Sequence, residues 1–234
     1  MKKSFLLIAV LLVFGSSVFA QDLDLGIKVG YQTPKLSYKQ ADIKAGFQNH
    51  LTFGLFGRVE LGMLYVQPEV MYFKTQNIFS LDMANTSQTW IPEETVTFTL
   101  NEANIQVPVL VGIKFLDLGV ATLRAQVGPT ANFTLASTTL FDKTFKLTND
   151  ETGEEVTLDE NKEVFDTKTI AWGMQAGLGA DILGKITLDI NYNFGLSKVF
   201  GRLNDASWNN YFDFSNVDNT KQSLFMVTVG YKFL

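Results

Sequence analysis

Apolar and polar residues alternate strictly over residues 168–196, in the clearest pattern of the chain. From Ile186 to Leu196 every second residue is apolar, and the residues between them are polar or glycine. The preceding stretch, from Ile170 to Ala180, alternates in the same way, and a turn at Leu183-Gly184 separates the two. A period of two sustained over this length indicates β-strands with one apolar face. The pattern predicts a β-hairpin.

Glycines occupy the polar face of this hairpin, at Gly173, Gly177, Gly179 and Gly195. A sheet face in contact with water would favour Thr, Lys and Glu, because glycine weakens strands. Glycine is easier to understand on a crowded interior face. We therefore expect the polar face to point inward and the apolar face to point outward into lipid.

Six further stretches alternate in the same way and raise the strand count to eight: 23–31, 51–60, 63–73, 105–115, 120–133 and 223–233. Each reaches the ~9–11 residues that a tilted membrane-spanning strand needs. The second, fourth and sixth strands are followed by tight turns, at Leu61-Gly62, Asp117-Leu118-Gly119 and Leu183-Gly184. The other connections run from roughly 20 to over 30 residues. Short turns at one rim and long loops at the other are typical of outer-membrane barrels, with the short turns periplasmic.

Residues 1–20 are predicted to be a secretory signal peptide, so that residues 21–234 form one barrel domain. Lys2 and Lys3 precede an apolar run from Phe5 to Phe14, and Val18 and Ala20 supply the small residues before a cleavage site. Cleavage would remove two of the 19 basic residues and none of the 24 acids, leaving a formal charge of −7. This acidic balance argues against nucleic acid as a partner. The absence of cysteine excludes disulfides and thiol chemistry.

Pro68 and Pro108 lie inside predicted strands. Each removes a hydrogen-bond donor from the ladder, and a closed barrel has no edge at which to place it. A bulge could accommodate each proline. The two residues therefore predict an irregular ladder at these points.

Several strands resemble a known family. The run FGLFGRVELGMLYVQPEVMYFKTQ resembles the second hairpin of the porin-like outer-membrane β-barrel family of Gram-negative bacteria. IQVPVLVGIKF, AQVGPTANF, AWGMQAGLGADI, ITLDINYNFGLSKVF and LFMVTVGYKFL are similar to its later strands. The resemblance implies an all-β, eight-stranded, antiparallel up-and-down barrel in the cell outer membrane, without implying an activity. The chain ends at Leu234, where the family often has an aromatic residue that the insertion machinery reads.

The inward face is predicted to carry mixed charges and amides: Lys28, Arg58, Gln67, Glu69, Gln106, Lys114, Arg124, Gln126, Asp181, Asp189 and Lys232. Charges inside a dry lumen must be paired, because a buried unpaired charge is costly. An eight-stranded interior is only wide enough for side chains to fill. We therefore expect a packed polar plug, with a selectivity filter as the alternative interpretation.

No catalytic, cofactor-binding or metal-binding residue is predicted. His50 is the only histidine, and Ser37 or Ser80 could lie near it, but their spacing does not support a catalytic triad. The loop over residues 137–168 holds nine acids and four lysines, yet its sequence does not fit an EF-hand. We expect a hairpin there instead, with strands over 144–148 and 155–159 around a turn at 149–153. Residues 95–100 also alternate directly into the fourth strand.

Aromatic residues are candidates for interfacial girdles: Trp90, Trp172, Trp208, Tyr31, Tyr72, Tyr192, Tyr211 and Tyr231. Tyr72 and Tyr231 fall near strand ends, as a girdle requires. Trp90 and Trp208 fall in loops, where they could pack loop against loop or touch a ligand.

The sequence thus predicts a monomeric outer-membrane barrel with a structural or porin-like role and no cofactor. One alternative is an adhesin or receptor whose long loops bind a cell-surface protein or glycan. A second is an outer-membrane lipid hydrolase. A soluble lipocalin-like carrier is the most distant alternative, since it would need its large apolar side chains inside.

Overall fold

The computed structural model describes residues 22–37, 44–47, 50–81, 90–92, 96–141, 145–149, 152–153, 155–158, 165–167, 169–197, 200–203 and 221–234. The predicted signal peptide lies outside these residues. Eight long strands form the body of the molecule: β1 (Asp22–Ser37), β3 (His50–Leu61), β4 (Leu64–Leu81), β6 (Val96–Asp117), β7 (Ala121–Phe141), β11 (Ile170–Ile182), β12 (Ile186–Gly195) and β14 (Lys221–Lys232). Shorter strands are β2 (Lys44–Phe47), β5 (Trp90–Pro92), β8 (Phe145–Asn149), β9 (Glu155–Leu158), β10 (Phe165–Thr167) and β13 (Phe200–Leu203).

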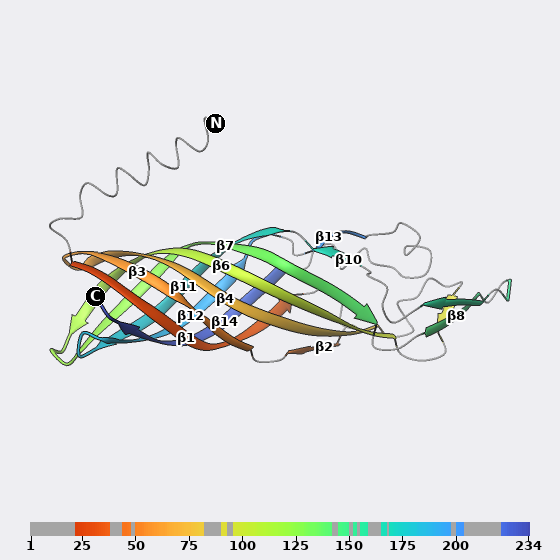
Figure 1. Cartoon of the computed structure of the whole chain (residues 1–234), viewed down its shortest axis with the longest axis horizontal. Helices are drawn as coiled ribbons and strands as arrows, with labels where there is room; N and C mark the ends of the chain where they lie inside the picture. Colours follow the sequence, from red (N-terminus) through yellow and green to blue (C-terminus); the bar gives the residue numbers. More distant parts are fainter. Residues whose placement is uncertain are drawn as a thin grey trace, which may run out of the picture.

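The eight long strands close into an antiparallel barrel in the order β1, β3, β4, β6, β7, β11, β12 and β14 (Figure 1). The last strand pairs with the first from Gly26–Lys232 to Ser37–Lys221. The pairing of β4 with β6 closes the other side of the circle. The predicted eight-stranded, all-β, antiparallel barrel is therefore confirmed. The described residues include no helix long enough and apolar enough to cross a membrane.

Tight turns join consecutive long strands at one rim of the barrel. Gly62, Gly119 and Gly184 adopt positive φ there, as tight turns require. At the β6–β7 turn, the Asp117 carboxylate accepts the Gly119 amide at 2.9 Å. The chain end lies at the same rim, because the Leu25 amide donates to the Leu234 carbonyl at 3.0 Å. This confirms the predicted sorting of short and long connections.

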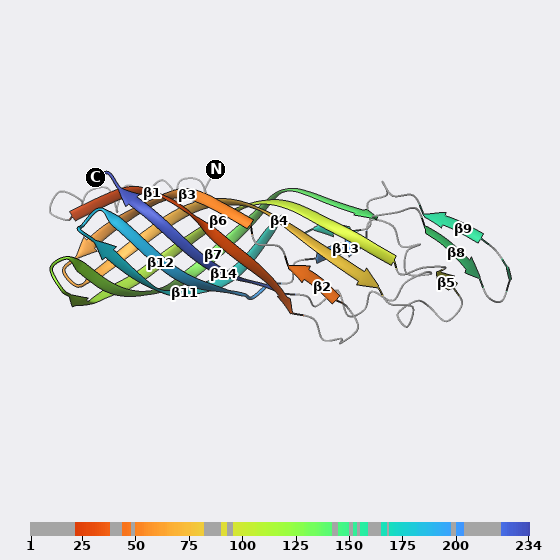
Figure 2. The same ribbon diagram turned by 90° about the horizontal axis from the view of Figure 1, so that it is seen from below.

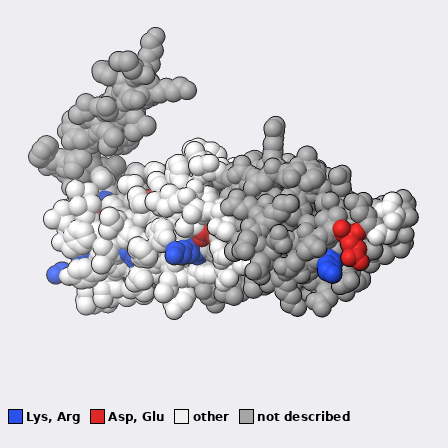
Figure 3. Space-filling view, turned by 45° about the vertical axis from the view of Figure 1, so that its right-hand side comes forward, with Lys and Arg blue, Asp and Glu red and all other residues white. Residues whose placement is uncertain are grey.

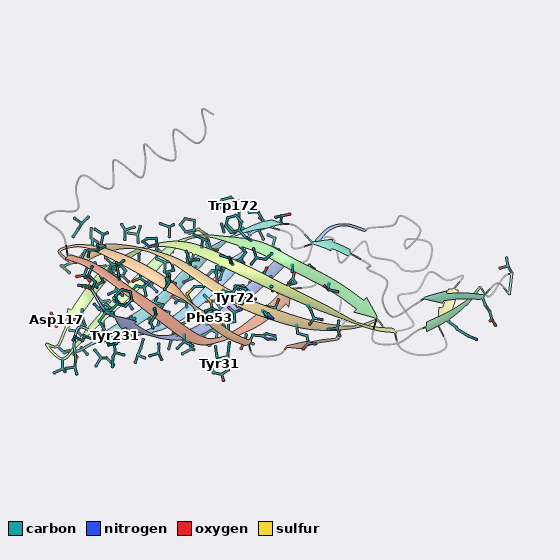
Figure 4. All side chains as sticks on the ribbon, viewed as in Figure 1. Tyr31, Phe53, Tyr72, Asp117, Trp172 and Tyr231 are labelled. Atoms are coloured by element: carbon teal, nitrogen blue, oxygen red, sulfur yellow. The ribbon has the colours of Figure 1, made fainter. Side chains whose placement is uncertain are left out.

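The barrel is apolar outside and polar inside. Along β12, Ile186, Leu188 and Ile190 are 40%, 39% and 55% exposed, whereas Asp189 and Asn191 are at most 2% exposed. The outer surface carries side chains of this apolar kind around the barrel (Figure 4). On the face shown in Figure 3, most of the described barrel surface bears neither basic nor acidic side chains. A soluble lipocalin-like carrier needs the opposite arrangement, so that alternative is wrong.

Aromatic side chains lie at two levels of this outer surface (Figure 4). Tyr231, 48% exposed, lies near the rim with the short turns. Trp172 and Tyr31, 58% and 60% exposed, lie toward the opposite end. Tyr72 is at that end too, and its ring centroid is 5.2 Å from that of Phe53. The predicted girdle positions of Tyr72 and Tyr231 agree with this arrangement. Three other candidates lie outside the described part of the chain: Trp208, Tyr211 and the side chain of Trp90.

Three neighbouring strands continue well beyond the barrel. β4, β6 and β7 have 18, 22 and 21 residues, far longer than the predicted 63–73, 105–115 and 120–133. β7 pairs with β11 only as far as Phe133–Ile170, but with β6 as far as Phe98–Phe141. The three extensions form a wall above one side of the mouth (Figure 2). We call it the β4–β6–β7 wall.

A second small sheet lies beyond this wall in both views (Figures 1 and 2). Its strands run in the order β5, β8, β9, and β8 pairs with β9 from Phe145–Leu158 to Thr148–Glu155. Gly153, in the turn between them, has a φ of 70°. The hairpin predicted in the acidic loop is therefore confirmed.

The ladder is irregular at both prolines, as predicted, although no bulge lies there. On the β3–β4 ladder, pairing skips Gly57 and Arg58, opposite Pro68. On the β4–β6 ladder it skips Val107 and Pro108. The register is the same on either side of each gap, so the strands separate locally without shifting. Each gap is two residue pairs wide, and the alternation of inward and outward faces continues beyond it.

Protease added to intact cells should cleave between Asp142 and Asp166, because outer-membrane barrels place their long loops outside the cell. The turns at Leu61-Gly62 and Leu183-Gly184 should be protected in the periplasm. Mass spectrometry of the released fragments would locate the cuts. Cleavage at the short turns of intact cells would mean the opposite orientation.

Candidate functional site

Ion pairs gather in the half of the lumen nearest the short turns. Lys28, from β1, contacts Glu69 of β4 at 2.5 Å and Asp189 of β12 at 2.8 Å. The Lys28 and Asp189 side chains have no exposed surface. These contacts cross the lumen, because β1, β4 and β12 are not consecutive neighbours around the barrel. The wall segments are thereby tied together through the interior.

All three guanidinium nitrogens of Arg124, on β7, donate hydrogen bonds. It donates from Nε to Asp181 at 3.1 Å and from a terminal nitrogen to Asp189 at 2.5 Å. It also hydrogen-bonds to Thr187 and, at 3.2 Å, to the Tyr65 hydroxyl. A buried guanidinium is stable only when its charge and its N–H groups are satisfied in this way.

Arg58, from β3, forms a second centre, in which one terminal guanidinium nitrogen has no hydrogen-bond partner among the described residues. Its Nε donates to Gln67 at 2.6 Å, and a terminal nitrogen pairs with Asp181. Its guanidinium also lies 5.0 Å from the Tyr65 ring centroid, within range of a cation–π contact. Nearer the rim, Lys232 pairs with Asp24 at 2.8 Å. Lys114 and Glu60 form a further, partly exposed pair.

This set, which we call the ionic plug, balances five basic against five acidic side chains: Lys28, Arg58, Lys114, Arg124 and Lys232, and Asp24, Glu60, Glu69, Asp181 and Asp189. All are buried except the three at the rim that are partly exposed, Lys114, Asp24 and Glu60. The inward positions predicted from the sequence are confirmed, and so is their mutual pairing. The described part of the chain contains no group of three or more His, Cys, Asp or Glu side chains placed to hold a metal ion.

Inward glycines make room for the large side chains of the plug. A Cβ on Gly112 would lie 2.1 Å from the Tyr65 ring, and one on Gly179 would lie 2.6 Å from the Arg124 guanidinium carbon. Both distances are far below van der Waals contact. This explains the glycines on the polar face that first indicated a crowded interior.

The other half of the lumen is chemically different. Phe73, Leu224 and Met226 form a small apolar layer. Around and beyond it stand amides and hydroxyls, such as the Gln106–Gln175 pair at 3.3 Å. Within the described residues, many of their buried polar atoms have no hydrogen-bond partner, among them atoms of Gln32, Asn104, Gln106, Asn132, Gln175 and Gln222. Glu102, 5% exposed, is the one buried carboxylate that the described residues bring to this half. We call this region the outer chamber.

Of the residues considered for catalysis, the structure describes only the side chain of His50. His50 begins β3, and its Nε2 accepts the Gln76 backbone amide at 3.0 Å. That bond occupies the lone pair that a general base would use. Ser37 and Ser80 lie on β1 and β4, but their side chains are outside the described part of the structure. The acidic loop is described only in the β8–β9 hairpin and short neighbouring segments.

Comparison with known proteins identifies the family. Residues 19–201 match the sequence profile of a family described as outer membrane protein beta-barrel domain. The chain belongs to this outer-membrane β-barrel family. It is accordingly a protein of the cell outer membrane. A search of curated proteins found no match.

Solved structures of other proteins are similar to this chain at low sequence identity. OprG of Pseudomonas aeruginosa is 13% identical, with a TM-score of 0.50 over 91% of this chain and 97% of that chain. Ail of Yersinia pestis, solved with the heparin analogue sucrose octasulfate, is 15% identical, with a TM-score of 0.43 over 91% and 99%. Neisserial surface protein A is 12% identical, with a TM-score of 0.40 over 89% and 97%. At these identities the likeness concerns the fold alone.

Proposed function

We propose that the protein is a non-conducting, non-enzymatic barrel with a structural, porin-like role in the outer membrane. In this proposal residues 1–20 are removed on export, and residues 21–234 insert as a monomer whose only constant partner is membrane lipid. The observation that supports it is the ionic plug. Its guanidinium and ammonium groups span the lumen and pair with carboxylates from other strands. A path for ions would require those pairs to separate inside a medium of low dielectric constant, which is costly.

The purified barrel should therefore show no stable channel in planar lipid bilayers. Its lumen is filled in the half nearest the short turns, where Arg58 and Arg124 have no exposed side-chain surface. The measurement is single-channel conductance at several salt concentrations, with an open porin of known conductance as the positive control. Steady, salt-dependent steps from the monomer would contradict the plug and favour the selectivity-filter interpretation.

A role in surface binding is the second candidate, and the β4–β6–β7 wall favours it. Strands that continue beyond the lipid-facing band are not needed to span a membrane. The β5–β8–β9 sheet adds a further ordered surface, at the end of the molecule far from the short turns (Figure 2). Ordered, projecting strands present a fixed surface to a cell-surface protein or a glycan.

A matched pair of cell strains would separate the two candidates. One would carry the full chain, and the other a chain whose residues 142–166 are replaced by a short Gly-Ser linker. Retained envelope integrity together with lost binding to host-cell proteins or a glycan array would support the surface-binding role. Equal binding by both strains would argue against it. A hydrolase, the third possibility, would show lipid cleavage that is lost in His50→Ala.

A further inference from the structure

Glu102 differs from the other buried carboxylates in having no charged partner among the described residues. It lies on β6 opposite Thr75 of β4, and it is 5% exposed. Its carboxylate accepts one hydrogen bond, from the Thr75 hydroxyl at 3.3 Å. Within the described part of the chain, no Lys, Arg or His side chain forms an ion pair with it. Every carboxylate of the ionic plug, by contrast, has at least one cationic partner.

A buried carboxylate in this situation requires compensation. Burying an unpaired charge costs several kcal/mol, so the group must bind either a proton or another cation. One hydrogen bond from a neutral hydroxyl supplies only a small part of that cost. The surroundings of Glu102 indicate which kind of cation fits.

A small cavity of about 20 Å³ adjoins Glu102. Its polar lining includes Asn104, Asn132, Thr134, Asn193 and Gln222. A space of this size admits at least one particle of about the size of a water molecule. The cavity is thus large enough for a single ion.

Three amides in the lining have atoms without a partner. They are Nδ2 of Asn104, Oδ1 of Asn132 and Nε2 of Gln222. Asn104 is only 4% exposed, so its orphaned nitrogen has no access to bulk water. Its oxygen accepts the Thr134 hydroxyl at 3.0 Å. A hydroxyl can accept a hydrogen bond as well as donate one. If the Asn104 side-chain amide were rotated by 180°, its Nδ2 would donate to the Thr134 hydroxyl, and its Oδ1 would be free to bind a ligand.

We propose that this cavity binds a single hard cation through the Glu102 carboxylate and the amide and hydroxyl oxygens of Asn104, Asn132 and Thr134. Oxygen ligands of this mixed kind suit Ca²⁺, which tolerates irregular geometry, better than Mg²⁺, which demands a near-ideal octahedron. With one carboxylate the site should be weak, because affinity rises with the number of charged ligands.

The position of the site gives it a structural effect. Its ligands come from β6 and β7, and the cavity also touches β12 and β14 through Asn193 and Gln222. It lies where β6 and β7 leave the barrel and continue into the β4–β6–β7 wall. A bound cation would therefore link β6 to β7 at this point and fix the base of the wall.

The test uses the full mature chain, refolded in detergent micelles and dialysed against a chelator in choline chloride at constant ionic strength. CaCl₂, MgCl₂ or NaCl is then added, and thermal unfolding and ⁴⁵Ca²⁺ binding are measured. We expect Ca²⁺ to raise the unfolding midpoint by several degrees, with half of the effect at roughly 0.1–1 mM, and about one ion to bind per chain. A comparable effect of Na⁺ alone would support the same site with a monovalent ion.

Variants connect the effect to the cavity. Glu102→Gln should abolish both the stabilisation and the binding. Glu155→Gln, in the exposed β8–β9 hairpin, is the matched control and should preserve both. Asn132→Asp adds a second carboxylate and should tighten Ca²⁺ binding about tenfold, an effect that a purely structural asparagine would not show. A wild-type chain insensitive to every cation would overturn the proposal and leave a proton as the compensating charge. So would a Glu102→Gln variant that responds like wild type.

Discussion

Replacing Arg124 by methionine should destabilise the barrel by about 3–5 kcal/mol, the scale observed when one partner of a buried ion pair is removed. Methionine fills much of the volume of arginine but removes the charge. Asp189 would keep only Lys28 as a cationic partner, and the Tyr65 and Thr187 hydroxyls would lose a hydrogen bond each. Reversible urea unfolding of the barrel in lipid vesicles would measure the loss.

Lys114→Met is the control for this experiment. Lys114 pairs with Glu60 at the rim, where its side chain is 23% exposed. Partly exposed pairs contribute little, so the loss should be about 1 kcal/mol or less. In the double variant Arg124→Met, Asp189→Asn, the second substitution removes a carboxylate that has already lost one of its two cationic partners, so the two losses should not add. An Arg124→Met barrel within about 1 kcal/mol of wild type would show that the plug contributes little to stability.

The sequence predicted which residues enter the lumen, because a strand has only two faces. Once the glycines at 173, 177 and 179 assigned the polar face to the interior, the inward position of Arg58, Arg124 and Asp189 followed from the alternation alone. The short turns were predictable for a similar reason. A Leu-Gly pair separates two alternating stretches at each of these turns. So few residues can connect two adjacent strands only through a tight turn.

The pairing inside the lumen could not be predicted in the same way. Arg58 and Asp181 are 123 positions apart, and they meet only because the barrel closes and the strands stagger. Which of the five acids a given cation selects depends on the register of strands that are not neighbours. Alternation fixes the face of a residue, but it does not fix its height in the barrel relative to distant strands.

The sequence predicted only part of the β4–β6–β7 wall, where residues 95–100 alternate directly into the fourth strand, and it did not predict the outer chamber. Around Asn101 and Glu102 both faces of β6 become polar, so the alternation that identifies a strand is interrupted there. A register shift between Ala103 and Asn104 also exchanges the faces of β7 near Leu135. Glu102 could then be recognised as buried and unpaired only from the structure.

Substituting arginine for Ile190 should cost about 2–4 kcal/mol, because a lipid-facing cation near the bilayer midplane costs this much in an outer-membrane barrel. Ile190 lies mid-strand on β12 and is 55% exposed on the outer face, between Leu178 of β11 and Val227 of β14. Asn191, its inward neighbour, accepts Gln126 Nε2 at 2.8 Å. Asn191→Ser keeps a hydroxyl in the lumen and should cost less, about 1 kcal/mol. Ile190→Leu should be nearly silent.

Ile190→Ala separates a lipid-facing position from a position covered by protein, such as a second copy of the chain. In a packed core the substitution opens a cavity and costs about 2–5 kcal/mol. Against fluid lipid the acyl chains fill the space, and mainly the transfer cost of about 0.8 kcal/mol per lost methylene remains. We therefore expect a loss near or below about 2 kcal/mol in vesicle unfolding experiments. A clearly larger loss would mean that protein packs against this face, because only a rigid neighbour leaves a cavity unfilled.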